Sequence, residues 1–384
     1  MKIIRKSLIV SVCFFGSLMF SQQISIDDSF TAQQLIQDYL VQGCVEASNV
    51  NSPVNGSING FASFAYFERG SSNFPFENGI MLSTGRAVSG GNGINTAVLN
   101  EGQSDWLTDP DLEAALGIDN TLNATAIEFD FVSISNQIQF NYIFASEEYF
   151  ADFPCNYSDA FVFLIKEAGS SNPYTNIAVI PGTSTPVNTN TIHPEIAGFC
   201  PASYEEYFAG YNLMDTNYNG QTTILSAVAS IVPNTTYRIK LVIADQRDKN
   251  YDSAVFIQGN SFNASVDLGD DVTTCSSSTV LDGNIQNPAA SYSWFLNGFL
   301  VANANQPTYV ATQSGTYTVK ITIPFGGSNC VIEDHVEVTL NSTQTADAIP
   351  DFQLCDDPSG DGIEIFDLGS MDAVVLAAVP DSNY

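Results

Sequence analysis

The stretch NYIFASEEYFADFPCNYSDAFVFLI, residues 141–165, places two adjacent glutamates between two apolar runs. Both runs, 141–145 and 160–165, are rich in β-branched and aromatic residues, so they are predicted to be buried strands. The connection between them carries four carboxylates, Glu147, Glu148, Asp152 and Asp159. Acid catalysis, metal binding and turn formation can each account for such a concentration of acids beside a core.

Strand-like runs continue on both sides of this stretch. They include AIEFDFV (126–132), NIAVI (176–180), TILSAVASIV (223–232), TYRIKLVIA (236–244) and SAVFIQGNSF (253–262). Residues typical of turns separate these runs. Helical signals are confined to 31–41, with Thr31 as the cap, and to 109–117, with Asp109 as the cap and Gly117 as the stop. We therefore predict an all-β, jelly-roll-like sandwich with short peripheral helices over residues 22–264.

A smaller module is predicted over residues 265–340. Strands recur there every 8 to 12 residues with Gly or Asn turns, as in an immunoglobulin-like sandwich. Trp294 is expected to be its core aromatic residue. The antibody-type tyrosine corner is absent, because Tyr317 does not stand two residues before Cys330. A polycystic-kidney-disease-like (PKD-like) relative is therefore favoured, and residues 341–384 read as the start of an incomplete third module.

The N-terminus predicts export. Residues 1–6 carry Lys2, Arg5 and Lys6, an uncharged apolar stretch covers 7–20, and polar residues follow, which is the order of a signal peptide over residues 1–21. The apolar stretch is too short for a stable transmembrane anchor. The formal net charge of −31 argues against nucleic acid and anionic lipid as partners, because both would be repelled. A secreted or cell-surface protein is expected.

Four stretches carry a resemblance to a known family. They are FENGIMLSTG (76–85), IFASEEYFADFPCNYSDAFVFLI (143–165), IAVIPGTSTPVNTNTIHPE (177–195) and IADQRDKNYDSAVFI (243–257). Together they resemble the choice-of-anchor L domain of bacterial exported proteins. The resemblance implies a secreted or cell-surface protein and no known reaction.

The end of the chain carries a second resemblance. CDDPSGDGIEIFDL (355–368) resembles repeats that precede a type IX sorting domain. This resemblance implies a type IX secretion substrate that is cut off before its sorting domain. Attachment to the outer-membrane surface would then run through a C-terminal region missing from this sequence.

The acids of two connections suggest a calcium site. Calcium takes six to eight oxygen ligands, and both connections follow long predicted strands. If the connections meet at one end of the sandwich, six carboxylates converge there and would repel one another without a cation. The candidate ligands are Glu147, Glu148, Asp159, Asp245, Asp248 and Asp252.

Turn formation and catalysis stay open as alternative roles for these acids. Asp and Ser side chains accept backbone N–H bonds at turns, and Arg247 and Lys249 stand close enough in sequence to neutralise Asp245 and Asp252. A glycoside hydrolase would need two carboxylates about 5 to 10 Å apart, for which Glu147 or Glu148 with Asp252 qualifies by residue type.

The cysteines are disulfide candidates. Six lie beyond the predicted signal peptide, no CxxC pair exists, and the chain has only two histidines, so zinc is poorly supported. Cys155 and Cys200 flank one long loop and are predicted to pair. Cys275 and Cys330 lie in one module and are the natural second pair. The pairing of Cys44 and Cys355 is open, and Cys44 could instead take one of the first two.

These observations predict a function in extracellular binding or adhesion, not an enzyme. The large domain would be the head, held by Ca²⁺, and the smaller module a spacer. The expected partner is an extracellular ligand, either a glycan or a surface protein. A secreted carbohydrate-active hydrolase that uses the paired carboxylates is the alternative.

Overall fold

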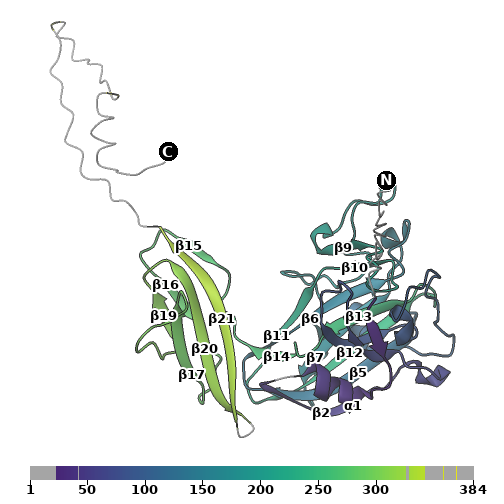
Figure 1. The fold of residues 1–384 in the computed structure, drawn as a ribbon, viewed down its shortest axis with the longest axis horizontal. Coiled ribbons are helices and arrows are strands. Elements are labelled where there is room, and N and C mark those ends of the chain that lie inside the picture. The colour runs from purple at the N-terminus through teal and green to yellow at the C-terminus, as the bar shows by residue number, and fades with distance from the viewer. Residues whose placement is uncertain (1–22, 42, 326–327, 342–357, 359–368, 370–384) are drawn as a thin grey trace, which may run out of the picture. The chain divides into compact units, whose positions relative to one another are not determined.

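The computed structural model describes residues 23–41, 43–325, 328–341, 358 and 369 (Figure 1). The predicted signal peptide, nearly all of the predicted third module, and Cys355 lie outside these residues. The described residues form two compact units. The first extends to Val266 and includes 285–290 and 322–332, and the second contains 267–284, 291–321 and the residues from Glu333 onward.

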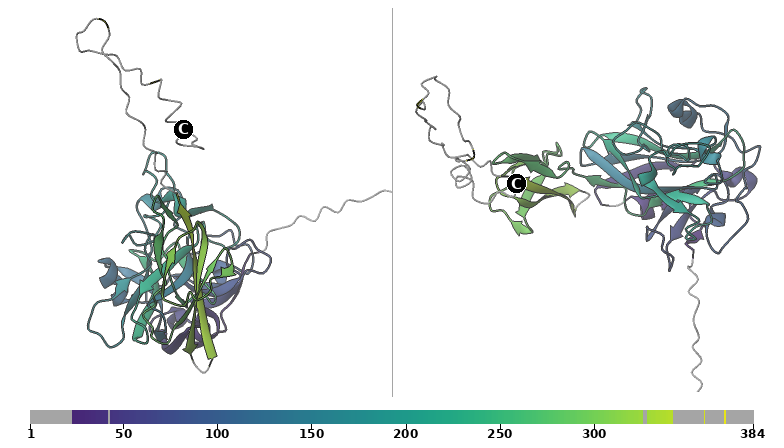
Figure 2. Two further views of the ribbon diagram at one scale, coloured as in Figure 1. Left: turned by 90° about the vertical axis from the view of Figure 1, so that its left-hand side faces the viewer. Right: turned by 90° about the horizontal axis from the view of Figure 1, so that it is seen from above.

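The first unit is built from two antiparallel sheets (Figures 1 and 2). In the larger sheet the strands follow the order β1 (Ser25–Asp27), β3 (Phe64–Glu68), β4 (Asn78–Ser83), β13 (Ser253–Gln258), β6 (Gln137–Ser146), β10 (Gly220–Thr222) and β9 (Phe208–Tyr211). Two further strands, β11 (Leu225–Ser230) and β14 (Asn263–Ser265), also pair with β6. The smaller follows the order β2 (Val45–Asn51), β5 (Thr121–Ser133), β12 (Thr236–Gln246), β7 (Ala160–Glu167), β8 (Thr175–Asn176). The predicted all-β sandwich is confirmed.

Aromatic side chains fill the space between the two sheets. Phe140 and Tyr142 of β6 face Phe163 of β7, with ring centroids 4.8 Å and 5.0 Å from that of Phe163. Phe129 of β5 packs edge-on against Phe262, 5.4 Å away. Such rings bury a large apolar area, so they dominate the stability of this core.

The outer face of the smaller sheet is also covered. All of residues 160–165 in β7 are buried, so the strand does not alternate between core and solvent. The short helix α2 (Pro110–Leu116) lies over this face, where Leu112 packs in a cluster with Ala126, Val162 and Val242. Small side chains such as Ala126 leave room for the helix to approach, and burial on both faces explains the continuous apolar run.

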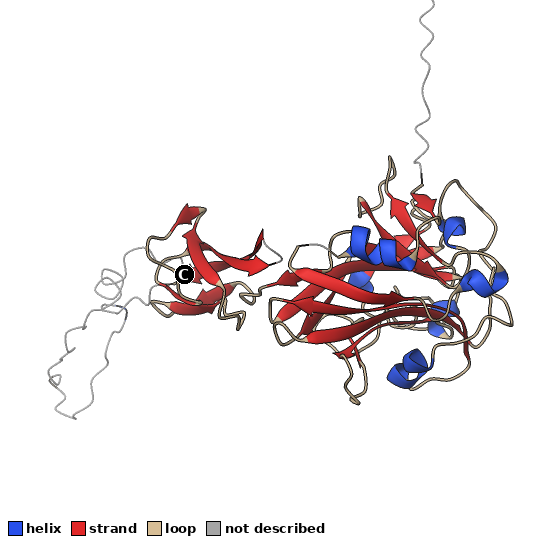
Figure 3. Cartoon of the chain, turned by 90° about the horizontal axis from the view of Figure 1, so that it is seen from below, coloured by secondary structure: helices blue, strands red, loops and turns tan. Residues whose placement is uncertain are grey.

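The helices are short and peripheral, as predicted (Figure 3). Asp109 caps α2 by accepting from the backbone N–H groups of Asp111 and Leu112, and Gly117 ends it with a φ of 67°. Thr31 forms a capping box with Gln34. The other elements are α1 (Ala32–Gln34), the π-helix η1 (Leu35–Leu40) and the 3₁₀ turns η2 (Gly56–Asn59), η3 (Ala87–Gly90), η4 (Phe153–Cys155) and η5 (Glu205–Tyr207).

The second unit has its own small core. Trp294 is buried, donates through Nε1 to the Gln306 carbonyl and stacks on Tyr309, which confirms its predicted core position. The immunoglobulin- or PKD-like assignment stays a prediction. The strands that lie wholly in this unit are β15 (Val272–Thr274), β16 (Thr279–Asp282), β17 (Ser291–Leu296), β18 (Phe299–Leu300) and β19 (Thr308–Ala311), and those that lie partly in it are β20 (Gly315–Phe325) and β21 (Ser328–Leu340). Five pair in the order β15-β21-β20-β17-β18, and β16 pairs with β19.

The disulfides agree with the sequence in one case only. Cys155 is bridged to Cys200 as expected, but Cys330 is bridged to Cys44 and not to Cys275. Cys275 directly follows β15, which pairs with the far end of β21 at Val338 to Leu340. Cys330 stands ten residues earlier on β21, roughly 33 Å away along an extended strand, so the predicted pair cannot form. Cys275 is a free, exposed thiol.

Removing the Cys155–Cys200 bridge should destabilise the first unit. The two residues are 45 apart in sequence, and a loop of that length corresponds to about 4 kcal/mol in the loop-entropy model. We expect Cys155→Ser/Cys200→Ser to lower the free energy of unfolding by about that amount in urea titrations. Cys275→Ser, which removes only the exposed thiol, is the matched control and should leave it unchanged. Equal stability of both variants would contradict the prediction.

Candidate functional site at the acidic end of the large sandwich

Two connections between the sheets meet at one end of the first unit. The β6–β7 connection, 147–159, and the β12–β13 connection, 247–252, both cross from one sheet to the other. The register brings their strand ends together, because Ser253 pairs with Ser146 and Ala244 pairs with Ala160. The Glu147 N–H also donates to the Asp252 carbonyl at 3.1 Å. The sequence-predicted acids are therefore neighbours in space.

Five of the six candidate ligands are buried there. Each is at most 6 % exposed, and we call them the acidic cluster: Glu147, Glu148, Asp159, Asp245 and Asp252. Asp248 is exposed, and its Oδ1 accepts from the Asn250 N–H at 2.9 Å, which is ordinary turn chemistry. Carboxylates are rarely buried unless they are paired with a positive group. The burial of five of them at one end of the sandwich therefore requires a physical cause.

Two members of the acidic cluster hold a loop over the site. Glu147 Oε1 accepts from the Leu99 N–H at 3.1 Å, and both oxygens of Asp252 accept from the Glu101 N–H at 3.0–3.1 Å. Gly85 packs so closely on Asp252 that an added Cβ would overlap its carboxylate. These contacts fix residues 99–102 against the strand ends.

Glu148 and Asp159, two further members of the acidic cluster, both accept hydrogen bonds from buried donors, and Asp159 itself supplies one donor to Glu148. Glu148 Oε2 accepts from the Asp159 N–H at 2.8 Å and from the Thr189 hydroxyl at 3.3 Å. Asp159 in turn accepts from the Gln246 N–H at 3.2 Å and the Ser253 hydroxyl at 2.6 Å. The loop closed by the Cys155–Cys200 disulfide supplies Thr189, so that bridge helps to cover Glu148.

Asp245 differs from the other four acids. It is fully buried, and neither of its carboxylate oxygens has a hydrogen-bond partner. Close to it lie Oδ1 of Asn123, which is also buried and unpartnered, and the backbone carbonyl of Lys249. Sequence reasoning missed both oxygen atoms, because Asn123 stands in a strand far from the acids and a carbonyl leaves no signal in the sequence.

Burial raises the pKa of every member of the acidic cluster. It raises the pKa values of Glu147, Glu148 and Asp252 to about 7. It raises the pKa values of Asp159 and Asp245 well above their usual range, with repulsion from neighbouring carboxylates adding to the effect. The nearby Thr84 hydroxyl lowers the pKa of Asp245 in part, although its position relative to the carboxylate is not that of a hydrogen bond.

The described basic side chains do not neutralise the acidic cluster. The ion pairs of the described residues involve other acids, and the Arg247 guanidinium instead reaches the Asn156 carbonyl at 3.4 Å. Also among the described residues, no group of three or more His, Cys, Asp and Glu side chains is arranged to hold a metal ion by itself. Any cation here would need neutral oxygen ligands as well.

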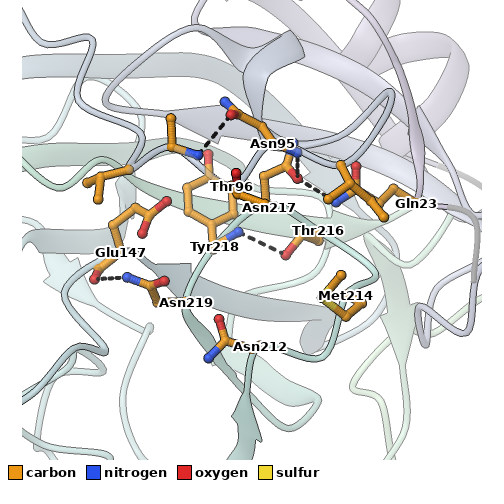
Figure 4. Close-up of a pocket in the computed structure, with 13 residues that line it drawn as sticks. Gln23, Asn95, Thr96, Glu147, Asn212, Met214, Thr216, Asn217, Tyr218 and Asn219 are labelled. Carbon is orange, nitrogen blue, oxygen red and sulfur yellow. Dashed lines mark hydrogen bonds between the residues drawn. The ribbon is translucent and has the colours of Figure 1, made fainter.

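A small pocket lies beside the acidic cluster (Figure 4). Its volume is about 200 Å³. Glu147 belongs to both, and Asn219 donates to the Glu147 carbonyl at 2.7 Å. The lining is rich in amide and hydroxyl groups, with exposed apolar side chains from Ile94, Val98 and Met214. The lining residues are Gln23, Ile94, Asn95, Thr96, Ala97, Val98, Glu147, Asn212, Met214, Thr216, Asn217, Tyr218 and Asn219.

Comparison with solved structures finds distant likenesses. The apo structure of Bacteroides uniformis beta-glucuronidase 3 is 8 % identical, with 58 % of this chain and 27 % of that chain covered and a TM-score of 0.20. The adhesin domain of Epf from Streptococcus pyogenes is 9 % identical, with 58 % and 78 % covered and a TM-score of 0.18. The chain thus spans about a quarter of the glucuronidase, and such low TM-scores carry no argument about function. No curated protein matches the chain.

The fold and the acidic end together define an all-β sandwich domain with a buried acidic site. The family model of the choice-of-anchor L domain matches residues 23–263, and the chain belongs to this family. Membership fits a protein of the cell surface and does not point to an enzyme. In the part of the chain that the structure describes, no helix has the length and apolar character needed to cross a membrane.

Proposed function

We propose that this protein binds an extracellular ligand through the first unit, as an exported adhesion protein. The pocket of Figure 4 is the observation that carries the proposal. Its lining contains amides, hydroxyls and one carboxylate but no Lys, Arg or His, so it suits a neutral polar group better than an anion. At about 200 Å³ it is smaller than a drug-sized site and matches one terminal sugar unit of a glycan.

Calcium belongs to the proposal as a structural cation. Five buried carboxylates without a neutralising basic side chain support it, because unpaired buried charge is costly. Export by the signal peptide, type IX secretion and attachment to the outer-membrane surface complete the proposal. These last three rest on the sequence, since residues 1–22 and nearly all of 342–384 lie outside the described part.

The observations favour binding over glycoside hydrolysis. A glycosidase needs two carboxylates on either side of one sugar, and Glu147 is the one carboxylate among the pocket-lining residues. Glu148 and Asp252 are buried and accept backbone N–H bonds, so neither faces a sugar-sized space. A raised pKa alone does not make either an acid catalyst, because the geometry for proton transfer is missing.

A glycan array tests the proposed binding. We expect the purified chain to retain a subset of glycans that share one terminal sugar, and Thr96→Trp to abolish retention by filling the pocket that Thr96 lines. Val228→Trp is the matched control, because Val228 is exposed on β11 and does not line the pocket. Retention of no glycan, or equal retention by the Thr96→Trp variant, would refute sugar binding at this pocket and leave a surface protein as the partner to test.

A further inference from the structure

Three buried oxygen atoms without hydrogen-bond partners gather at one place in the first unit. They are both carboxylate oxygens of Asp245 and Oδ1 of Asn123, and both residues are fully buried. Buried polar atoms nearly always have a partner, so orphaned oxygens that share one location indicate a bound group that completes them. A cation satisfies all three oxygens at once, whereas one water molecule donates only two hydrogen bonds.

The position of Gly102 shows that these oxygens converge. A methyl group built there would lie 2.9 Å from Asp245 Oδ2 and 2.6 Å from the Lys249 carbonyl oxygen, and would also contact Asn123 Oδ1. Asn123 is oriented for this, since its Nδ2 donates to the Gln103 carbonyl at 2.6 Å and its Oδ1 points the other way. The three residues come from β5, β12 and the loop after β12, and Gly102 packs against all three oxygens with no side chain between them.

The backbone is irregular where the oxygens meet. The pairing of β12 with β5 shifts register between Ile243 and Asp245, and Asn123 has a φ of 52°. A bulge re-aims side chains that a regular ladder would send to opposite faces. It thereby allows Asp245 and Asn123 to point to the same place.

We propose that the protein binds one divalent cation of the calcium class between Asp245, Asn123 Oδ1 and the Lys249 carbonyl. Calcium accepts such a mixture of carboxylate, amide and carbonyl oxygens in irregular geometry, whereas magnesium demands a near-ideal octahedron. Waters would fill the remaining positions. The proposal rests on the calcium-stabilised first unit proposed above. Of the three ligand residues, only Asp245 is among the acids that the sequence singled out, and the Asn123 amide oxygen and the Lys249 carbonyl are new.

The cation would hold three segments together. Asp245 stands near the end of β12, Lys249 lies in the β12–β13 connection, and Gly102 ends the loop that Glu147 and Asp252 hold. Residues 94–98 of the same loop line the pocket. Cation binding therefore acts on the geometry of the pocket without touching its ligand.

The test uses the full chain, freed of metal by a chelator and titrated with calcium chloride in a calorimeter. We expect one binding event, weakened at least about tenfold in Asp245→Asn, which removes the only charged ligand without changing shape. Gly102→Ala should weaken binding similarly, because its Cβ would occupy the space between the oxygens. Asp215→Asn is the control and should bind as the native chain does, since Asp215 is a buried acid whose Oδ1 accepts from the Asn73 N–H elsewhere.

Melting temperatures supply an independent readout. Metal-free Asp245→Asn should melt higher than the metal-free native chain, because the asparagine is neutral and its amide N–H groups can donate to the oxygens around it, and calcium should no longer raise its melting temperature. No calcium binding by the native chain, or unchanged affinity in both Asp245→Asn and Gly102→Ala, would overturn the proposal. The glycan array is scored separately, so loss of calcium binding with glycan binding retained would refute this site and not the proposed adhesion.

Discussion

Without calcium, the protein is expected to become more stable as the pH falls from 7.5 to 5.5, with a rise in melting temperature of about 5–10 °C. Burial raises the native-state pKa values of Glu147, Glu148 and Asp252 to about 7, whereas these groups titrate near their usual values once unfolded. Between those values the native state binds more protons than the unfolded state. The free energy of unfolding therefore decreases as the pH rises through this window.

Calcium should remove or reverse this dependence. A cation favours the ionised carboxylates, so its stabilising effect should be large at pH 7.5 and small at pH 5.5. Differential scanning fluorimetry across this range, with chelator and with calcium, measures both curves. The two curves should approach each other at the acidic end.

The high negative charge of the chain needs a control, because repulsion between surface acids also weakens a fold at high pH. Roughly 0.5 M NaCl screens exposed charges strongly and buried charges little. The pH dependence should survive this salt if the acidic cluster causes it. A metal-free melting temperature that rises from pH 5.5 to 7.5, or a dependence that salt abolishes, would contradict the prediction.

The second large effect on stability is expected from substitution of Lys240, a lysine on β12 whose side chain is buried. Its Nζ lies 2.7 Å from Asp109 Oδ2 and 2.7 Å from Asp111 Oδ2, so it anchors the start of α2 to the smaller sheet. Lys240→Met should lower the free energy of unfolding by about 3–5 kcal/mol, because Asp109 would be left charged and buried. Urea denaturation of the metal-free chain measures the loss.

A double variant separates charge from packing. In Asp109→Asn/Lys240→Met the asparagine can still cap α2 and no unpaired buried charge remains, so most of the lost stability should return. Asp111 is partly exposed and can be solvated in either variant. A single variant within about 1 kcal/mol of the native chain, or a double variant no better than the single, would show that the ion pair does not anchor α2.

Much of the fold is predictable because its signals are local. Runs such as 160–165 combine β-branched and aromatic residues, and the capped segment 109–117 carries its own start and stop. The burial of 160–165 was predicted as well, from its unbroken apolar run, but the sequence did not show that α2 is the element that covers the outer face of the smaller sheet. Local patterns report what a segment prefers and not what packs on it.

The candidate site was predictable in part. The acids of the two connections could be expected to meet if both connections lie at one end, and the structure brings Glu147, Glu148, Asp159, Asp245 and Asp252 together. Their roles could not be read from the sequence. Glu147 and Asp252 bind backbone N–H groups of the 99–102 loop, and Asp248 is exposed to solvent.

The sequence by itself determined an all-β, acidic, cysteine-containing chain with strand runs, helix caps and two acid-rich connections, because each of these depends on residues adjacent in the chain. Only the tertiary structure decided that Cys44 pairs with Cys330, that Asn123 and the Lys249 carbonyl lie beside Asp245, and that Gly102 packs against all three. Those outcomes depend on strand register, on a bulge and on crossings between sheets. Cys44 and Cys330, like Asn123 and Asp245, stand more than one hundred positions apart and meet through packing that no local pattern encodes.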